Sequence, residues 1–270
     1  MKRKILVAPL LALTIVYSGC KVDNTQKIFD TITVSQEQHS FVYLFADQGN
    51  YFSDDFQDTI FNKALAGNVS GVNAAKLHGI VLYPDVFFDT TLFTSTAESF
   101  LQLFSNIGDQ SFSSYPSVFE GMRNHQKNYA TWKHSIDSVQ KAVPLCGIGL
   151  AKQEFGTNVN IYAKVEFFSM VHDSVGLAVY LVENNVKAPQ RVTPSDTAAS
   201  YLHNHVLLAA LNDDFGQTMG NHPTSGSIYK VSNSVTLPSS VNKNNVEYIA
   251  VVYQYQGDKP VKVLNCASIK

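Results

Sequence analysis

Cysteine and net positive charge are both scarce in this chain of 270 residues. Its three cysteines, Cys20, Cys146 and Cys266, lie far apart, so no two have the close spacing of a dithiol redox site. The formal net charge is −2, without the excess of Lys and Arg that phosphate backbones attract. The composition therefore excludes redox chemistry by a local cysteine pair and argues against a nucleic-acid partner.

Long apolar runs are also missing, and the one at the N-terminus is short. Residues 5–16 form an uncharged apolar run, whereas a membrane-spanning helix needs roughly 20 apolar residues. Cationic residues at 2–4 precede the run, and small residues at 18–19 follow it. This layout is typical of a secretory signal peptide, which we assign to residues 1–19.

The signal peptide ends at a cysteine. The segment Tyr17-Ser18-Gly19-Cys20 resembles the lipobox of bacterial lipoproteins, although Tyr17 stands where Leu is usual. The resemblance implies that Cys20 is lipidated and becomes the new N-terminus, with residues 20–36 as a tether. Cleavage there changes the net charge to −5, because three basic residues leave. The alternative is an ordinary signal peptide followed by a chance cysteine.

The first half of the mature chain, residues 37–143, alternates between two kinds of segment. The runs at 40–46 and 77–83 are rich in Val, Ile and aromatic residues and predict buried strands. Apolar residues at helical spacing predict helices at 53–67, 96–108 and 128–142. This alternation predicts an α/β unit.

The second half, residues 144–270, has little helical periodicity. Runs such as "NVNIYAKVEFF" and "VEYIAVVYQYQ" are β-rich and are separated by Gly, Asn, Asp and Pro. Short strands at this spacing predict a β-sandwich of about 125 residues. The predicted fold class is therefore α/β plus all-β, with a boundary near residue 143.

Three segments of the second half resemble a known family. "VYLVENNVKAPQ" (179–190), "YLHNHVLLAALNDDFGQ" (201–217) and "IAVVYQY…VKVLNCA" (249–267) resemble the 28-kDa outer-membrane-protein-related lipoproteins of Bacteroidetes. The resemblance implies a thioredoxin-like domain followed by an immunoglobulin-like β-sandwich. It implies lipid anchorage at the outer membrane, on either the surface or the periplasmic face. Members of this family have no well-established activity.

The thioredoxin-like resemblance also allows a test for redox chemistry. Such enzymes carry two cysteines after the first strand, where the helix dipole lowers the pKa of the attacking thiol. Here that stretch is "ADQGNYFSDD" (46–55), which has no cysteine. The segment "SSYPSVFEGMRN" resembles the strand that carries the cis-proline of this fold, with Pro116 in that position. We therefore expect the scaffold without its nucleophile.

His203 and His205 are the candidate metal ligands. A strand would place both imidazoles on one face, where they could contribute to a zinc or copper site. Such a site needs three or four ligands, and no carboxylate or cysteine follows at ligand spacing. The alternative is a structural role for both rings. We expect no cofactor.

Cys146 and Cys266 are a candidate disulfide. Fold analogy places them on the first and last strands of the sandwich, which commonly run side by side. A bridge would close a loop of about 120 residues. The alternative is two separate buried thiols, since free cysteine packs as a small hydrophobe.

A short triplet recurs along the chain: Asp, then Ser or Thr, then a small apolar residue or Thr. It resembles the O-glycosylation acceptor of Bacteroidetes. The candidate acceptors are Thr31, Thr90, Ser138, Ser174 and Thr197. A sixth triplet, at Thr59, falls inside a predicted helix and is the poorest. The alternative is that these are turn and cap pairs.

Two functional hypotheses follow. The first is a non-catalytic, lipid-anchored envelope protein that binds or scaffolds an envelope protein or a glycan. The second is a thiol- or metal-dependent envelope enzyme that works with a partner supplying the missing group.

Overall fold

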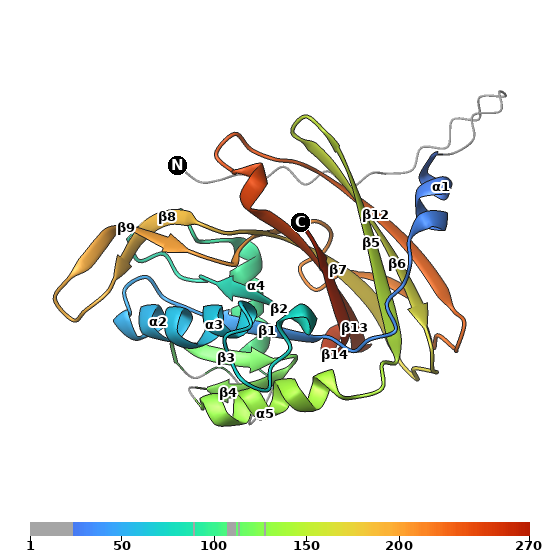
Figure 1. The fold of residues 1–270 in the computed structure, drawn as a ribbon, viewed down its shortest axis with the longest axis horizontal. Coiled ribbons are helices and arrows are strands. Elements are labelled where there is room, and N and C mark those ends of the chain that lie inside the picture. The colour runs from blue at the N-terminus through green and yellow to red at the C-terminus, as the bar shows by residue number, and fades with distance from the viewer. Residues whose placement is uncertain (1–23, 89, 107–111, 113, 127) are drawn as a thin grey trace.

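The computed structural model describes residues 24–88, 90–106, 112, 114–126 and 128–270 (Figure 1). The fold is mostly β-sheet, with 44% of residues in strands and 20% in helices. Within the described residues, no helix is long and apolar enough to cross a membrane. The signal peptide and the lipidation site predicted at Cys20 lie outside the described residues.

One nine-stranded sheet in the described part of the chain runs through both halves of the molecule. The predicted strands at 40–46 and 77–83 pair in parallel at its centre. The halves meet where Val206 pairs in parallel with Val81. An additional strand, β11 (Gln217–Asn221), pairs with β7. The remaining strands, in spatial order, are β14 (Lys259–Ile269), β13 (Val246–Gln256), β7 (Ser174–Glu183), β10 (Val206–Ala210), β2 (Leu77–Leu82), β1 (Ser40–Phe45), β3 (Ser117–Glu120) and β4 (Arg123–Gln126).

The second half contributes two smaller sheets. The first, in the order β12 (Ile228–Thr236), β6 (Asn158–Phe167) and β5 (Cys146–Phe155), is antiparallel throughout. Its inner side chains share one apolar cluster with those of β7 and β13, so the two sheets form the layers of a sandwich. The other is the hairpin β8 (Val186–Arg191) and β9 (Thr197–His203), which reaches toward the first half.

The helices begin and end close to the predicted limits. Thr94 caps one helix by accepting a hydrogen bond from the backbone N–H of Ala97, and Asn128 caps another by accepting from Thr131. The helix predicted at 53–67 contains a π-helical turn at its centre. The helical elements are α1 (Asn24–Thr31), α2 (Tyr51–Phe56), η1 (Gln57–Phe61), α3 (Asn62–Leu65), η2 (Ala74–Lys76), α4 (Ser95–Phe104), α5 (Tyr129–Gln140) and η4 (Lys243–Asn245).

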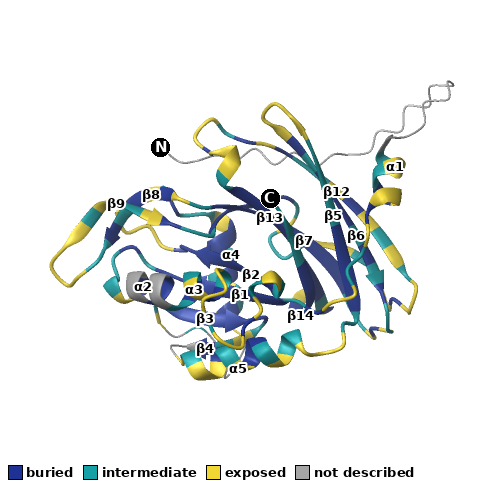
Figure 2. Ribbon diagram, viewed as in Figure 1, coloured by how far each residue is buried: buried dark blue, intermediate teal, exposed yellow. Residues whose placement is uncertain are grey.

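Both faces of the central sheet are covered along its length (Figure 2). On one face, α4 packs against strands of both halves. On the other, helices α2, α3 and α5 cover the first half, and the three-stranded sheet covers the second. Three buried tyrosines join the halves on the α4 face, because the Tyr253 hydroxyl lies 2.5 Å from that of Tyr43 and 3.0 Å from that of Tyr180.

Residues 24–36, which we assigned to the tether, pack on the outer face of the three-stranded sheet. Phe29 and Ile32 are buried, and the Phe29 ring meets Tyr162 edge to face at 5.6 Å. Two glycines of β5 let the backbone approach. A Cβ atom at Gly147 would lie 1.9 Å from the carbonyl oxygen of Ser35, and one at Gly149 would meet Thr33. The described chain therefore begins docked rather than free.

Candidate binding surface

The segment that follows β1 is held by the β8–β9 hairpin of the other half. The Nε2 group of Gln190 lies 3.4 Å from the carbonyl oxygen of Asp47 and 3.2 Å from that of Asn50. In return, the side-chain amide of Gln48 donates to the carbonyl of Pro189 at 2.9 Å. Both glutamine side chains are buried, so these bonds replace lost hydration and fix the segment in place.

The polar side chains of this segment are engaged in local contacts. Asp47 accepts a hydrogen bond from the backbone N–H of Gly49 at 2.8 Å. Asn50 donates to the carbonyl of Tyr115 at 3.1 Å, and the Tyr115–Pro116 peptide bond is cis, the isomer that the resemblance implies. The Tyr115 hydroxyl donates to Asp85, and burial and this bond raise the tyrosine pKa. The side chains of Asp47, Asn50 and Tyr115 are thus occupied by these contacts.

Exposed apolar side chains lie within the segment and beside it. Phe52, Val86 and Phe87 are about half exposed and Phe88 is 37% exposed; together they are here called the aromatic patch. The rings of Phe87 and Phe88 meet edge to face at 4.8 Å. Phe87 also lies directly on Gly49, where a Cβ atom would come within 2.3 Å of the ring. Gly49 therefore lets the ring seat on the segment while its outer face stays in solvent.

The patch combines apolar area with a cation. The guanidinium carbon of Arg191 lies 5.6 Å from the centre of the Phe87 ring, which is cation–π distance. Exposed aromatic groups on a fixed backbone suit the binding of an apolar side chain or the face of a sugar ring.

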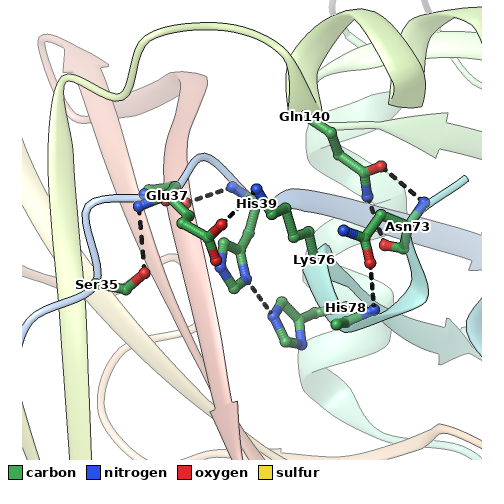
Figure 3. Close-up of polar contacts among 9 residues, drawn as sticks. Ser35, Glu37, His39, Asn73, Lys76, His78 and Gln140 are labelled. Carbon is green, nitrogen blue, oxygen red and sulfur yellow. Dashed lines mark hydrogen bonds and ion pairs between the residues drawn. The ribbon is translucent and has the colours of Figure 1, made fainter.

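A polar cluster, separate from the aromatic patch, lies where the chain enters β1 (Figure 3). The rings of His39 and His78 stack at 5.1 Å, and Nδ1 of His39 lies 2.8 Å from Nε2 of His78. Beside them, Lys76 forms a 2.7 Å ion pair with Glu37. Burial lowers the pKa of both histidines, with that of His78 falling to about 3, so both rings are neutral at pH 7.

The structure separates the two predicted metal ligands. His203 ends β9 and is buried, with Nδ1 2.8 Å from the Tyr83 hydroxyl. His205 lies in a bend with φ of 55°, where burial lowers its pKa to about 4. The prediction of one strand face was wrong, because Asn204 and His205 turn the chain between two strands. Among the described residues, no group of three His, Cys, Asp or Glu side chains is arranged to hold a metal ion.

Cys146 and Cys266 are free, buried thiols in the structure. Their strands are close, since Asn265 donates to the carbonyl of Cys146 at 2.7 Å. Their side chains nevertheless belong to different cores: Cys146 packs between the sandwich layers and Cys266 packs on the α4 face. This arrangement supports the alternative of two separate thiols, and burial raises the pKa of Cys146 to about 12.

The five candidate glycosylation residues differ in exposure. Thr31 in α1, Ser138 in α5 and Thr197 at the start of β9 are exposed. Thr90 and Ser174 are partly buried. The hydroxyl of Thr31 donates to the carbonyl of Ile28 at 2.8 Å, a local bond that an added sugar would break.

The aromatic patch is the feature that sequence reasoning missed. Apolar residues such as Phe87 and Phe88 are usually read as core, and nothing in their spacing distinguishes exposed from buried rings. Their position soon after a strand and before a run of Thr and Ser was the available signal, because loops after strands lie on the surface.

Two solved structures share the fold of most of the chain. HBP35 of Porphyromonas gingivalis superposes with a TM-score of 0.68 at 12% identity, covering 88% of this chain and 76% of its own. Protein AGR_C_4864 from Agrobacterium tumefaciens superposes with a TM-score of 0.55 at 12% identity, covering 87% and 96%. The fold is therefore of the HBP35 type.

The family model of outer membrane protein Omp28 matches residues 118–270, more than half of the chain. The chain belongs to the Omp28 family, as its second half predicted, and its place is the outer membrane. A domain of the outer membrane lipoprotein Omp28 from Porphyromonas gingivalis is 19% identical, covering 48% of this chain and 89% of its own with a TM-score of 0.31. No curated protein matches the chain.

Proposed function

We propose that this protein is a non-catalytic binding protein, lipid-anchored at the outer membrane, and that the aromatic patch is its binding surface. The observation that carries the proposal is the contrast within the segment after β1. Its carbonyl groups accept from Gln190 and its own Gln48 donates to Pro189, whereas the rings of Phe52, within it, and Phe87, beside it, remain half exposed. Rings held on a fixed backbone lose little conformational entropy when they bind.

The proposal includes a domain assignment. Residues 37–143 are a thioredoxin-like unit without its redox pair, and residues 144–270 are an immunoglobulin-like sandwich. Support comes from the parallel pair β1–β2, the antiparallel β3 beside β1, and the two layers formed by β5–β6–β12 and β7–β13–β14. Pro116 takes the cis-proline position of the first unit.

The competing hypothesis is an envelope enzyme that uses a thiol or a metal with a partner. It lacks support in the described residues, where the two thiols are buried and no metal-binding group of three side chains occurs. A raised thiol pKa lowers the fraction of reactive thiolate. Insulin reduction by the purified protein, with and without zinc, separates the hypotheses: we expect no turnover.

Anchorage rests on Cys20. We expect Cys20→Ala to release the protein into the soluble envelope fraction and to abolish labelling by an alkyne fatty acid. Continued labelling of the alanine variant would contradict the assignment. Protease treatment of intact cells then decides between the surface and the periplasmic face.

The binding surface is tested by photo-crosslinking in the native host. A photoreactive amino acid replaces Phe88, and the matched control replaces Met170, which is 52% exposed and lies outside the patch. We expect one discrete covalent adduct from position 88 that Phe87→Ser weakens, and none from position 170. Deglycosylation of the adduct tells a protein partner from a glycan. No adduct at 88, or equal adducts at both positions, would refute the patch as the binding surface.

A further inference from the structure

The direction in which the chain leaves its proposed anchor determines which end of the sandwich lies nearest the membrane. Only residues 21–23 separate Cys20 from the start of α1. Four residue steps, even fully extended, span at most about 14 Å. The start of α1 is therefore held close to the bilayer if Cys20 carries the lipid, so this inference rests on the proposed anchorage.

The contacts of the N-terminal segment define its path along β5. Ser35 lies against Gly147 and Thr33 against Gly149. Phe29 meets Tyr162, which pairs with Ala151 one step further along. From Ser35 back toward Cys20, the chain therefore runs along β5 toward the turn of the β5–β6 hairpin. Figure 1 shows α1 beginning on the side of the molecule toward which this hairpin points.

The hairpin turn carries an exposed aromatic residue. Phe155 is the last residue of β5 and is 60% exposed. Side chains alternate along a strand, so Phe155 lies on the same face as Gly147, Gly149 and Ala151, the face on which α1 packs. The turn residues Gly156 and Thr157 beside it are also exposed, and Gly156 takes a φ of 66°.

We propose that the β5–β6 turn contacts the lipid bilayer beside the anchor, with Phe155 at the headgroup level. Aromatic side chains are favoured at the membrane–water interface, and a tethered domain needs only a weak extra contact to adopt one orientation. The lipid alone would leave the domain free to swivel. The turn thereby points the opposite end of β5, where α5 leads into the strand, away from the membrane (Figure 1).

The same sheet supplies a matched control. Ile228 is 50% exposed, but it pairs with Glu166 near the far end of β6. Eight strand residues, or about 27 Å, separate this level from that of the turn. A label on Ile228 therefore reports the end of the sheet that we expect to stay in water.

The test uses the full-length lipidated protein in vesicles of phosphatidylethanolamine and phosphatidylglycerol. Phe155→Cys and Ile228→Cys are each labelled with the fluorophore NBD, since both native thiols are buried. We expect a blue shift and quenching by nitroxide lipids at 155, at least threefold stronger than at 228. Thr157→Cys is a second reporter at the turn if the first variant folds poorly.

Flotation of the vesicles distinguishes a missing anchor from a missing turn contact. Protein that does not float has no working anchor, which would overturn both the anchorage and the turn contact. Protein that floats with an unquenched label at 155, or with equal quenching at 155 and 228, would overturn the turn contact alone.

Discussion

The α1 end and the aromatic-patch end of the molecule are held together by different kinds of contact. At both ends a segment that precedes the sandwich in the chain is held against strands of the second half: residues 24–36 at one end and the segment after β1 at the other. At the α1 end the fit is steric: Gly147 and Gly149 have no side chain, so the backbone of residues 33–35 lies directly on β5. At the patch end the contact is polar, because the amide of Gln190 bonds two carbonyl groups. The β-sandwich thus organises its neighbour at both ends.

The difference has a consequence for tolerance. A steric fit fails for any added side chain, whereas a hydrogen-bonded loop can be partly rehydrated when its partner is lost. The α1 end should therefore depend more steeply on single residues than the patch end.

The largest effect is expected from Gly147→Val. Its Cβ would collide with the Ser35 carbonyl, so residues 24–36 must leave the sheet and expose Phe29 and Ile32. We expect a loss of about 3 kcal/mol in the free energy of unfolding, measured in urea, and rapid proteolysis near α1. Phe155→Ser, on the same strand face but exposed, should cost less than about 0.5 kcal/mol. Equal losses would show that the close approach does not matter.

A pH experiment tests the region between the ends. Burial raises the pKa of Glu120 to about 7 from 4.5, opposed by the Ser135 hydroxyl. The folded state then prefers the protonated carboxyl, so its stability is highest below pH 4.5 and falls as the pH rises to 7. We expect Glu120→Gln to be about 3 kcal/mol more stable than the wild type at pH 8, with little difference at pH 4.

The measurement is urea unfolding of both proteins across this range. Histidines such as His78 titrate in both proteins alike, so the difference isolates Glu120. A constant difference at all pH values would contradict the raised pKa.

A smaller effect is expected from Gln190→Ala. The change removes the donors to Asp47 and Asn50 but leaves β8 intact, and we expect a loss of about 2 kcal/mol. Amide exchange should accelerate at residues 47–50 and not near α1. Lys187→Ala, exposed on the same strand, is the matched control and should change neither quantity. Acceleration near α1 as well would show that the two ends are coupled.

Local structure was predictable because it depends on local patterns. The Val, Ile and aromatic composition at 40–46 and 77–83 matched β1 and β2, and the helical spacing at 128–142 matched α5. The continuous sheet was not predictable, because its two halves join through one residue pair, Val206 with Val81. Periodicity says that a strand is buried, not which strand lies beside it.

For the candidate sites, too, features that depend on residue identity were predictable and features that depend on backbone conformation or long-range packing were not. The absence of a cysteine pair was evident from residues 46–55 alone, since it requires only residue identity. The docking of α1 was missed because its segment is largely polar, although Phe29 and Ile32, three apart, fit one helix face. The split between His203 and His205 depended on the positive φ of His205, which the sequence pattern does not reveal.

The course of the N-terminal segment also sets how the protein carries mechanical load. If Cys20 carries the proposed lipid, a pull on it that follows the direction of β5 loads the contacts of residues 32–39 in shear. These include the bonds from Lys164 to the Ile32 carbonyl, from Asn265 to the Glu37 carbonyl, and from Gln38 to the Leu264 carbonyl. Contacts loaded in parallel share the force, whereas a segment peeled from its end would lose them one at a time. The force then enters β1, at the centre of the sheet, and spreads to strands on both sides.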